Sequence, residues 1–95
     1  MDRNAAAALL DAHHAFPSDH RFQVIVRSSP DDVDAVLTAL ARHFLLPHLD
    51  GRCEQIPSRQ GTYVSLRLLL PCESAFSVLD TYALLGSHPS VIRCL

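Results

Sequence analysis

The six histidines of this chain are its most obvious candidate metal ligands, but their spacing predicts no metal site. Metal ligation needs lone pairs that converge on one point, often from compact motifs such as His-Glu-x-x-His. No such motif is present, and no cysteine adjoins a histidine in the set His13, His14, His20, His43, His48 and His88. We therefore expect surface histidines, no metal site and no cofactor.

Cysteine is the candidate nucleophile, at Cys53, Cys72 and Cys94. A reactive thiolate needs a base or a cation beside it. Arg52 and Arg93 each precede a cysteine, but neighbours along a strand point to opposite faces. Three thiols without a Cys-x-x-Cys pair are typical of a reducing compartment, so we expect inert thiols and a cytoplasmic protein.

Paired carboxylates at Asp31 and Asp32 follow Pro30, where a helix is expected to begin. The helix dipole favours acids there, and Ser29 is placed to cap the helix. A phosphate-binding loop at the same place is not expected, because Pro30 lacks an amide hydrogen and the acids repel an anion. The sequence therefore predicts no catalytic residue and no enzyme.

Composition predicts one globular domain, with 48% hydrophobic residues, 19% charged residues and a net charge of −2. No stretch approaches the roughly 20 apolar residues that cross a bilayer, because the apolar-rich segment 66–71 is short, so no membrane association is expected. Residues 1–15 hold an alanine run without the basic start of an export signal. We expect an N-terminal arm there, either helical or disordered, ahead of a single domain at 16–95.

The hydrophobic periodicity of residues 16–95 predicts the order β-α-β-β-α-β. Apolar residues alternate in 21–27, 63–70 and 91–95, and a weaker strand at 52–56 is followed by Pro57 and a turn at Gly61. A helix is predicted after each of 21–27 and 63–70, from apolar residues spaced three or four apart. The apolar stripe of the first helix is Val33, Val36, Leu37, Leu40 and Phe44, and that of the second is Phe76, Leu79, Tyr82 and Ala83.

Two right-handed crossovers in this order give an α+β, ferredoxin-like sandwich. Its antiparallel sheet has strand order 4-1-3-2, with both helices on one face. The opposite face then has no helix to cover it, and its expected residues are Gln23, Ile25, Arg27, Tyr63, Ser65, Arg67 and Leu69. The N-terminal arm, a second copy or a protein partner could cover them, and strand 91–95 is the edge expected to join copies.

The composition of this face favours a protein interface over RNA. RNA-recognition modules of this topology stack bases on aromatic residues of the sheet, and here Tyr63 is the only one. Arg27 and Arg67 give a slightly acidic protein little affinity for phosphates. Aliphatic, aromatic and arginine side chains together are typical of protein interfaces, so nucleic acid is not the expected partner.

Several short segments resemble the YbeD-like family of small bacterial proteins of unknown function. They are 16–19, 33–36, 42–43, 57–58 with Gly61, Tyr63 and Ser65, and His88-Pro89 before Val91. The resemblance spans about 16–95. It implies a ferredoxin-like fold similar to ACT regulatory domains and a regulatory link to lipoate metabolism, and it brings no catalytic residue.

These observations predict a noncatalytic, ACT-like regulatory or adaptor domain that acts through protein–protein contacts or self-association. The alternative is a small-metabolite sensor that uses Ser28, Ser29 and the backbone amides at the start of the first predicted helix. An RNA-binding module is the less favoured reading.

Overall fold

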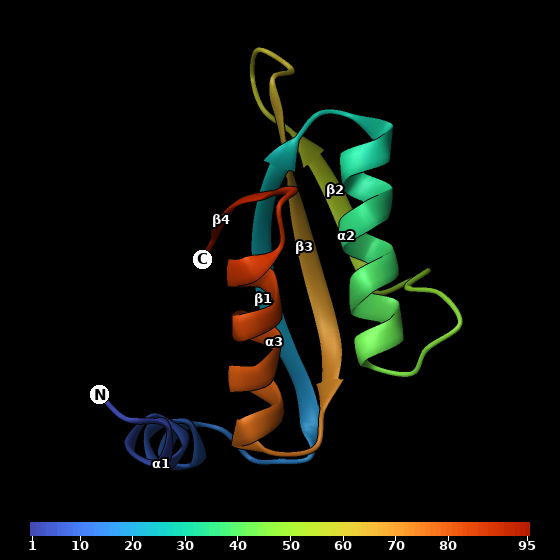
Figure 1. The fold of residues 1–95 in the computed structure, drawn as a ribbon. Helices are drawn as coiled ribbons and strands as arrows, with labels where there is room; N and C mark the ends of the chain where they lie inside the picture. The colour runs from blue at the N-terminus through green and yellow to red at the C-terminus, as the bar shows by residue number, and fades with distance from the viewer.

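One four-stranded antiparallel sheet and three helices make up the computed structural model, which describes residues 1–95 (Figure 1). The elements are α1 (Arg3–His13), β1 (Ser18–Arg27), α2 (Pro30–His43), β2 (Cys53–Pro57), β3 (Tyr63–Cys72), α3 (Ala75–Ser87) and β4 (Val91–Cys94). The strand order β2-β3-β1-β4 is the predicted order read from the other edge. The α+β, ferredoxin-like prediction is thus confirmed. None of the helices has the length and apolar character needed to cross a membrane.

The central strands β1 and β3 pair along their whole length, from Ser18 opposite Cys72 to Arg27 opposite Tyr63. Their alternation turns one set of apolar side chains toward α2 and α3, which lie on the same side of the sheet (Figure 1). The buried set consists of Phe22, Val24, Val26, Val64, Leu66, Leu68 and Leu70. The core therefore lies in one layer between the sheet and the two helices.

The edge strands are short. β2 has five residues and includes Pro57 as its last, so it begins and ends one residue later than the predicted strand 52–56. β4 has four residues, and its pairing with β1 shifts register between Ile25 and Val26. The predicted joining edge of the sheet is consequently shorter and less regular than the alternation in 91–95 indicates.

Helix α2 begins as predicted, with Pro30 at its first position and Asp31 and Asp32 in its first turn. Ser29 precedes the helix in an extended conformation, but its side chain makes no capping hydrogen bond, contrary to the prediction. Asp32 has a tertiary contact in addition to its dipole interaction, since the Ser90 hydroxyl donates to its Oδ1 at 2.9 Å. This bond connects the start of α2 to the turn that precedes β4.

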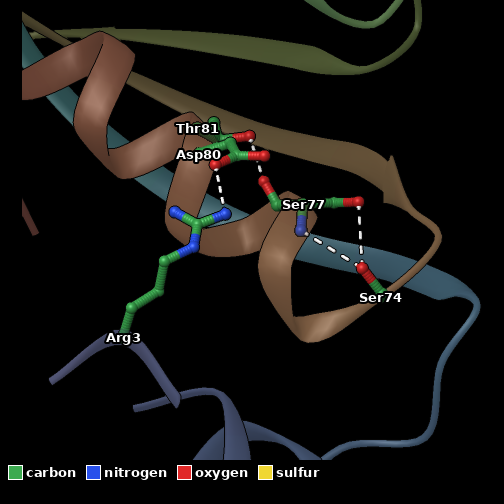
Figure 2. Close-up of polar contacts among 5 residues, drawn as sticks. All are labelled: Arg3, Ser74, Ser77, Asp80 and Thr81. Carbon is green, nitrogen blue, oxygen red and sulfur yellow. Dashed lines mark hydrogen bonds and ion pairs between the residues drawn. The ribbon is translucent and has the colours of Figure 1, made fainter.

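Helix α3 buries a different stripe from the predicted one. Its buried residues are Ala75, Val78, Thr81 and Leu85, whereas Phe76 is 40% exposed and Ala83 is also exposed. The Thr81 hydroxyl donates to the carbonyl of Ser77 at 2.8 Å, so its burial leaves no unpaired polar group (Figure 2). The prediction failed because α3 is apolar around most of its circumference. The hydrophobic periodicity alone therefore could not show which side of the helix is buried.

Helix α1 contacts α3 and lies beside it (Figure 1). Ala7 is 4% exposed and Leu10 packs against the core. Arg3 Nη2 is 2.6 Å from Asp80 Oδ1, and the Arg3 guanidinium carbon is 5.0 Å from the centre of the Phe76 ring (Figure 2 shows the ion pair). The N-terminal segment therefore docks on the helical layer and does not cover the opposite face of the sheet.

Leu45, just after α2, adopts a left-handed conformation with φ of 55° and is 91% exposed. The turn needs this conformation, because the Leu45 amide donates to Arg42 and the Leu46 amide to Ala41, which closes the helix end. A side chain has a steric cost there that glycine avoids. Leu45→Gly is therefore expected to raise the free energy of unfolding by roughly 0.5–1 kcal/mol, measured by urea denaturation.

Leu45→Ala is the matched control, because it removes the exposed side chain and keeps the Cβ atom that causes the strain. We expect its free energy of unfolding to stay within about 0.5 kcal/mol of the original. An equal gain in both variants, or no gain with glycine, would contradict the explanation.

Candidate functional site

The face of the sheet that points away from α2 and α3 holds all the residues predicted to form an interaction surface. Register brings them together, because Gln23 lies opposite Arg67, Ile25 opposite Ser65 and Arg27 opposite Tyr63. Leu69 follows two residues after Arg67 on the same face. We call this surface the open sheet face; its predicted members are Gln23, Ile25, Arg27, Tyr63, Ser65, Arg67 and Leu69.

Further residues that sequence reasoning missed belong to the open sheet face. Arg21 lies opposite Leu69, Glu54 opposite Arg67, Ile56 opposite Ser65, and Arg93 opposite Ile25. Arg21 could have been found, since it precedes Gln23 by two residues in the same alternation. The position of Arg93 could not, because it depends on the register shift in the pairing of β1 with β4.

The apolar members of the open sheet face remain accessible to solvent. Tyr63 is 42% exposed and Leu69 is 45% exposed, while Ile25 and Ile56 are half-buried on either side of Ser65. Apolar and aromatic side chains on an uncovered sheet can dock on another molecule without any rearrangement of the core. The open sheet face is therefore suited to binding. It does not bring an acid, a base and a nucleophile into contact with one another.

The arginines of the open sheet face are free of ion pairs. The salt bridges of the molecule join Arg3 to Asp80, His48 to Asp50, and Arg52 to Asp19 at 3.7 Å. Arg21, Arg27, Arg67 and Arg93 take part in none of them. Their guanidinium groups can therefore bind an incoming acceptor without first breaking an internal ion pair.

A shallow hollow of about 660 Å³ lies on the β2 side of this surface. The polar side chains around it come from β1, from β3, from β2 and from the residue that precedes β2. They are Arg21, Gln23, Arg52, Glu54 and Arg67. Arg52 is paired with Asp19, but the guanidinium groups of Arg21 and Arg67 are unpaired and face a single lining carboxylate, that of Glu54, which favours a negatively charged ligand.

The predicted ligand loop at Ser28 and Ser29 borders a hollow of about 470 Å³, with Asp34 also in its wall. Its amides are already in use, because Ser28 donates to the Thr62 carbonyl at 3.0 Å and Ser29 to the Arg27 carbonyl at 2.7 Å. The backbone amides of Ser28 and Ser29 are therefore not free to donate to a ligand. The hydroxyls of Ser28 and Ser29 make no hydrogen bond, so they could contact a ligand in this hollow.

Burial raises the pKa of all three thiols, that of Cys72 to about 11, with a further rise there from the charge of Asp19. Thiols with raised pKa values stay protonated near neutral pH and are poor nucleophiles.

The rings of His14 and His20 lie 5.0 Å apart. Burial lowers the pKa of His20, and repulsion from His14 lowers it further. No three His, Cys, Asp or Glu side chains come together as metal ligands.

Comparison with known proteins gives a family match and a curated relative. Residues 11–95 match the model of a family described as "Protein of unknown function (DUF493)". A UPF0250 protein of Janthinobacterium sp. (strain Marseille) is 32% identical over 76 residues, which cover 80% of this chain and 82% of that protein. Most of α1 precedes the family match, whereas the sheet, α2 and α3 lie inside it.

Proposed function

The chain belongs to the DUF493 family of proteins of unknown function, and from this premise we propose that it is a noncatalytic regulatory or adaptor domain that binds a protein partner. Membership confirms the YbeD-like resemblance inferred from the sequence. The proposed binding surface is the open sheet face. A link to lipoate metabolism, which the resemblance implies, is part of the same proposal and directs the first choice of partners to test.

One observation carries the proposal: the open sheet face combines exposed apolar side chains with unpaired arginines, and no helix of the chain covers it. Tyrosine and arginine are enriched at the energetically important positions of protein interfaces. Tyr63 and Arg67 fit this description and lie on the same central strand. The raised pKa values of the cysteines and the structural role of Asp32 support a function without catalysis.

The test compares the protein with a Tyr63→Ala, Arg67→Glu double variant by affinity capture from cell extract and by gel filtration with light scattering. We expect the double variant to keep its circular dichroism spectrum and to lose the captured partner or its self-association. Arg42→Glu, on the exposed surface of α2, is the control and should change neither. Unchanged capture and association in a folded double variant would refute the proposal.

Sensing of a small metabolite is the second candidate function, favoured by the hollow beside Ser28 and Ser29. In a titration with a panel of metabolites at millimolar concentration, binding there would shift the backbone amide signals of residues 27–33 in nuclear magnetic resonance spectra. Absence of shifts in that segment would reject this candidate and leave the open sheet face as the proposed site.

A further inference from the structure

We infer that the segment recognised by the open sheet face is an acidic, extended stretch of a partner protein, in which aspartate or glutamate occupies alternate positions. This inference rests on the proposed function and names the chemistry of the partner. It follows from where the charges of the molecule lie, from their spacing on the sheet, and from the apolar side chains among them.

Charge is distributed unevenly over a chain whose net charge is −2. The open sheet face holds four unpaired arginines, Arg21, Arg27, Arg67 and Arg93, against the carboxylate of Glu54. At its end, Asp19 is already paired with Arg52. Most other acids lie on the helices, namely Asp11 on α1, Asp31, Asp32 and Asp34 on α2, and Asp80 on α3. The face is thus a basic surface on an acidic protein, which selects acidic partners.

The spacing of the arginines matches an extended chain. Arg21 lies opposite Leu69 and Gln23 opposite Arg67, so Arg21 and Arg67 are diagonal neighbours, whose Cα atoms are typically about 7–8 Å apart. Alternate residues of an extended peptide are about 6.6–6.8 Å apart. Two alternate acidic side chains of such a peptide can therefore meet the guanidinium groups of Arg21 and Arg67, while the residue between them points the other way.

Arginine suits this task better than lysine, and the eight lysine and arginine residues of the chain are all arginines. The planar guanidinium group binds a carboxylate through two parallel hydrogen bonds. Phosphate can be bound in the same way, so the rest of the surface decides between a peptide and a nucleic acid. Tyr63 alone can stack on a base, whereas Ile25, Ile56 and Leu69 provide aliphatic contacts, which favours a protein segment.

The experiment uses the full chain and a fluorescein-labelled peptide in which glutamate alternates with valine and threonine, followed by fluorescence anisotropy. We expect binding that weakens as salt is added, because exposed charges are screened. An Arg21→Glu, Arg67→Glu double variant should bind at least about tenfold more weakly, and the Arg21→Gln, Arg67→Gln variant should show a smaller loss in the same direction. Arg42→Glu makes the same charge change on α2 and should alter the dissociation constant by less than about twofold.

A peptide with glutamine in place of glutamate should bind at least about tenfold more weakly. Equal binding of the two peptides, or an equal loss with Arg42→Glu, would overturn the inference. Tighter binding of a uridine oligonucleotide that depends on Arg21 and Arg67 would assign the surface to nucleic acid instead. Dimerisation that needs these arginines and resists the glutamate peptide would assign it to a second copy.

The outcomes also separate this inference from the proposed function. If capture of a protein needs Tyr63 and Arg67 but the glutamate peptide does not displace that protein, the adaptor function stands and the acidic partner is wrong. If the capture is independent of both residues, the proposed function fails, and with it the inference about its partner.

Discussion

Phe22→Ala is expected to lower the free energy of unfolding by about 3–5 kcal/mol, the largest effect that we expect from any single substitution in this chain. Phe22 is fully buried in the centre of β1, and its ring centre lies 5.2 Å from that of Tyr82 on α3. Truncation would remove apolar contacts between the sheet and α3 and leave a cavity. Because domains of this kind are stable by only about 5–15 kcal/mol, urea denaturation should show a large fall in the midpoint.

Phe76→Ala is the matched control for this prediction. Its side chain has the same size, but Phe76 is 40% exposed and its ring contacts the Arg3 guanidinium group. Loss of that contact and of partial burial should cost less than about 1.5 kcal/mol. Equal losses in the free energy of unfolding for Phe22→Ala and Phe76→Ala would contradict the placement of Phe76 outside the buried side of α3.

Ala7→Glu is expected to detach α1 from α3. Ala7 is the buried residue of α1, at 4% exposed, and a carboxylate there would have to lose its hydration or push the helices apart. A helix of 11 residues is marginal in water without tertiary contacts, so detachment should also melt it. Hydrogen exchange in residues 3–13 should then approach the rate of an unfolded peptide, with a loss of roughly 1–3 kcal/mol in overall stability.

Ala8→Glu places the same charge on the exposed side of α1 and should leave hydrogen exchange in residues 3–13 slow. Slow exchange in both variants would mean that the Ala7 contact does not hold α1 in place. Fast exchange in both would mean that helix propensity, rather than docking, controls this segment.

The strand order could be predicted because the central strands β1 and β3 carry a two-residue alternation that fixes their buried face, and right-handed crossovers then leave few ways to pair the edge strands. Phe22, Val24 and Val26 show it for β1, and they pair as the pattern requires. The phase of α3 could not be predicted, because apolar residues surround it. The docking of α1 includes the contact of Arg3 with Asp80, which are separated by 77 positions, and no local pattern records such a contact.

The membership of the open sheet face follows from the same alternation, which places Arg67 and Leu69 with Gln23 on one side of the sheet. Its charge is higher than Arg27 and Arg67 alone predict, because Arg21 and Arg93 also belong to it. The local geometry at Ser29 was also beyond prediction. A serine before Pro30 is well suited to cap a helix, yet its hydroxyl makes no such bond here.

The outer strands bear on how this protein behaves when many copies are crowded together. An exposed strand edge can recruit a neighbour's backbone and extend into a fibril, and long flat edges carry the greatest risk. β2 offers five residues that finish at a proline without an amide hydrogen, and β4 offers four across a shifted register. Each copy of this chain thus offers only a short stretch of main chain for such fibril growth.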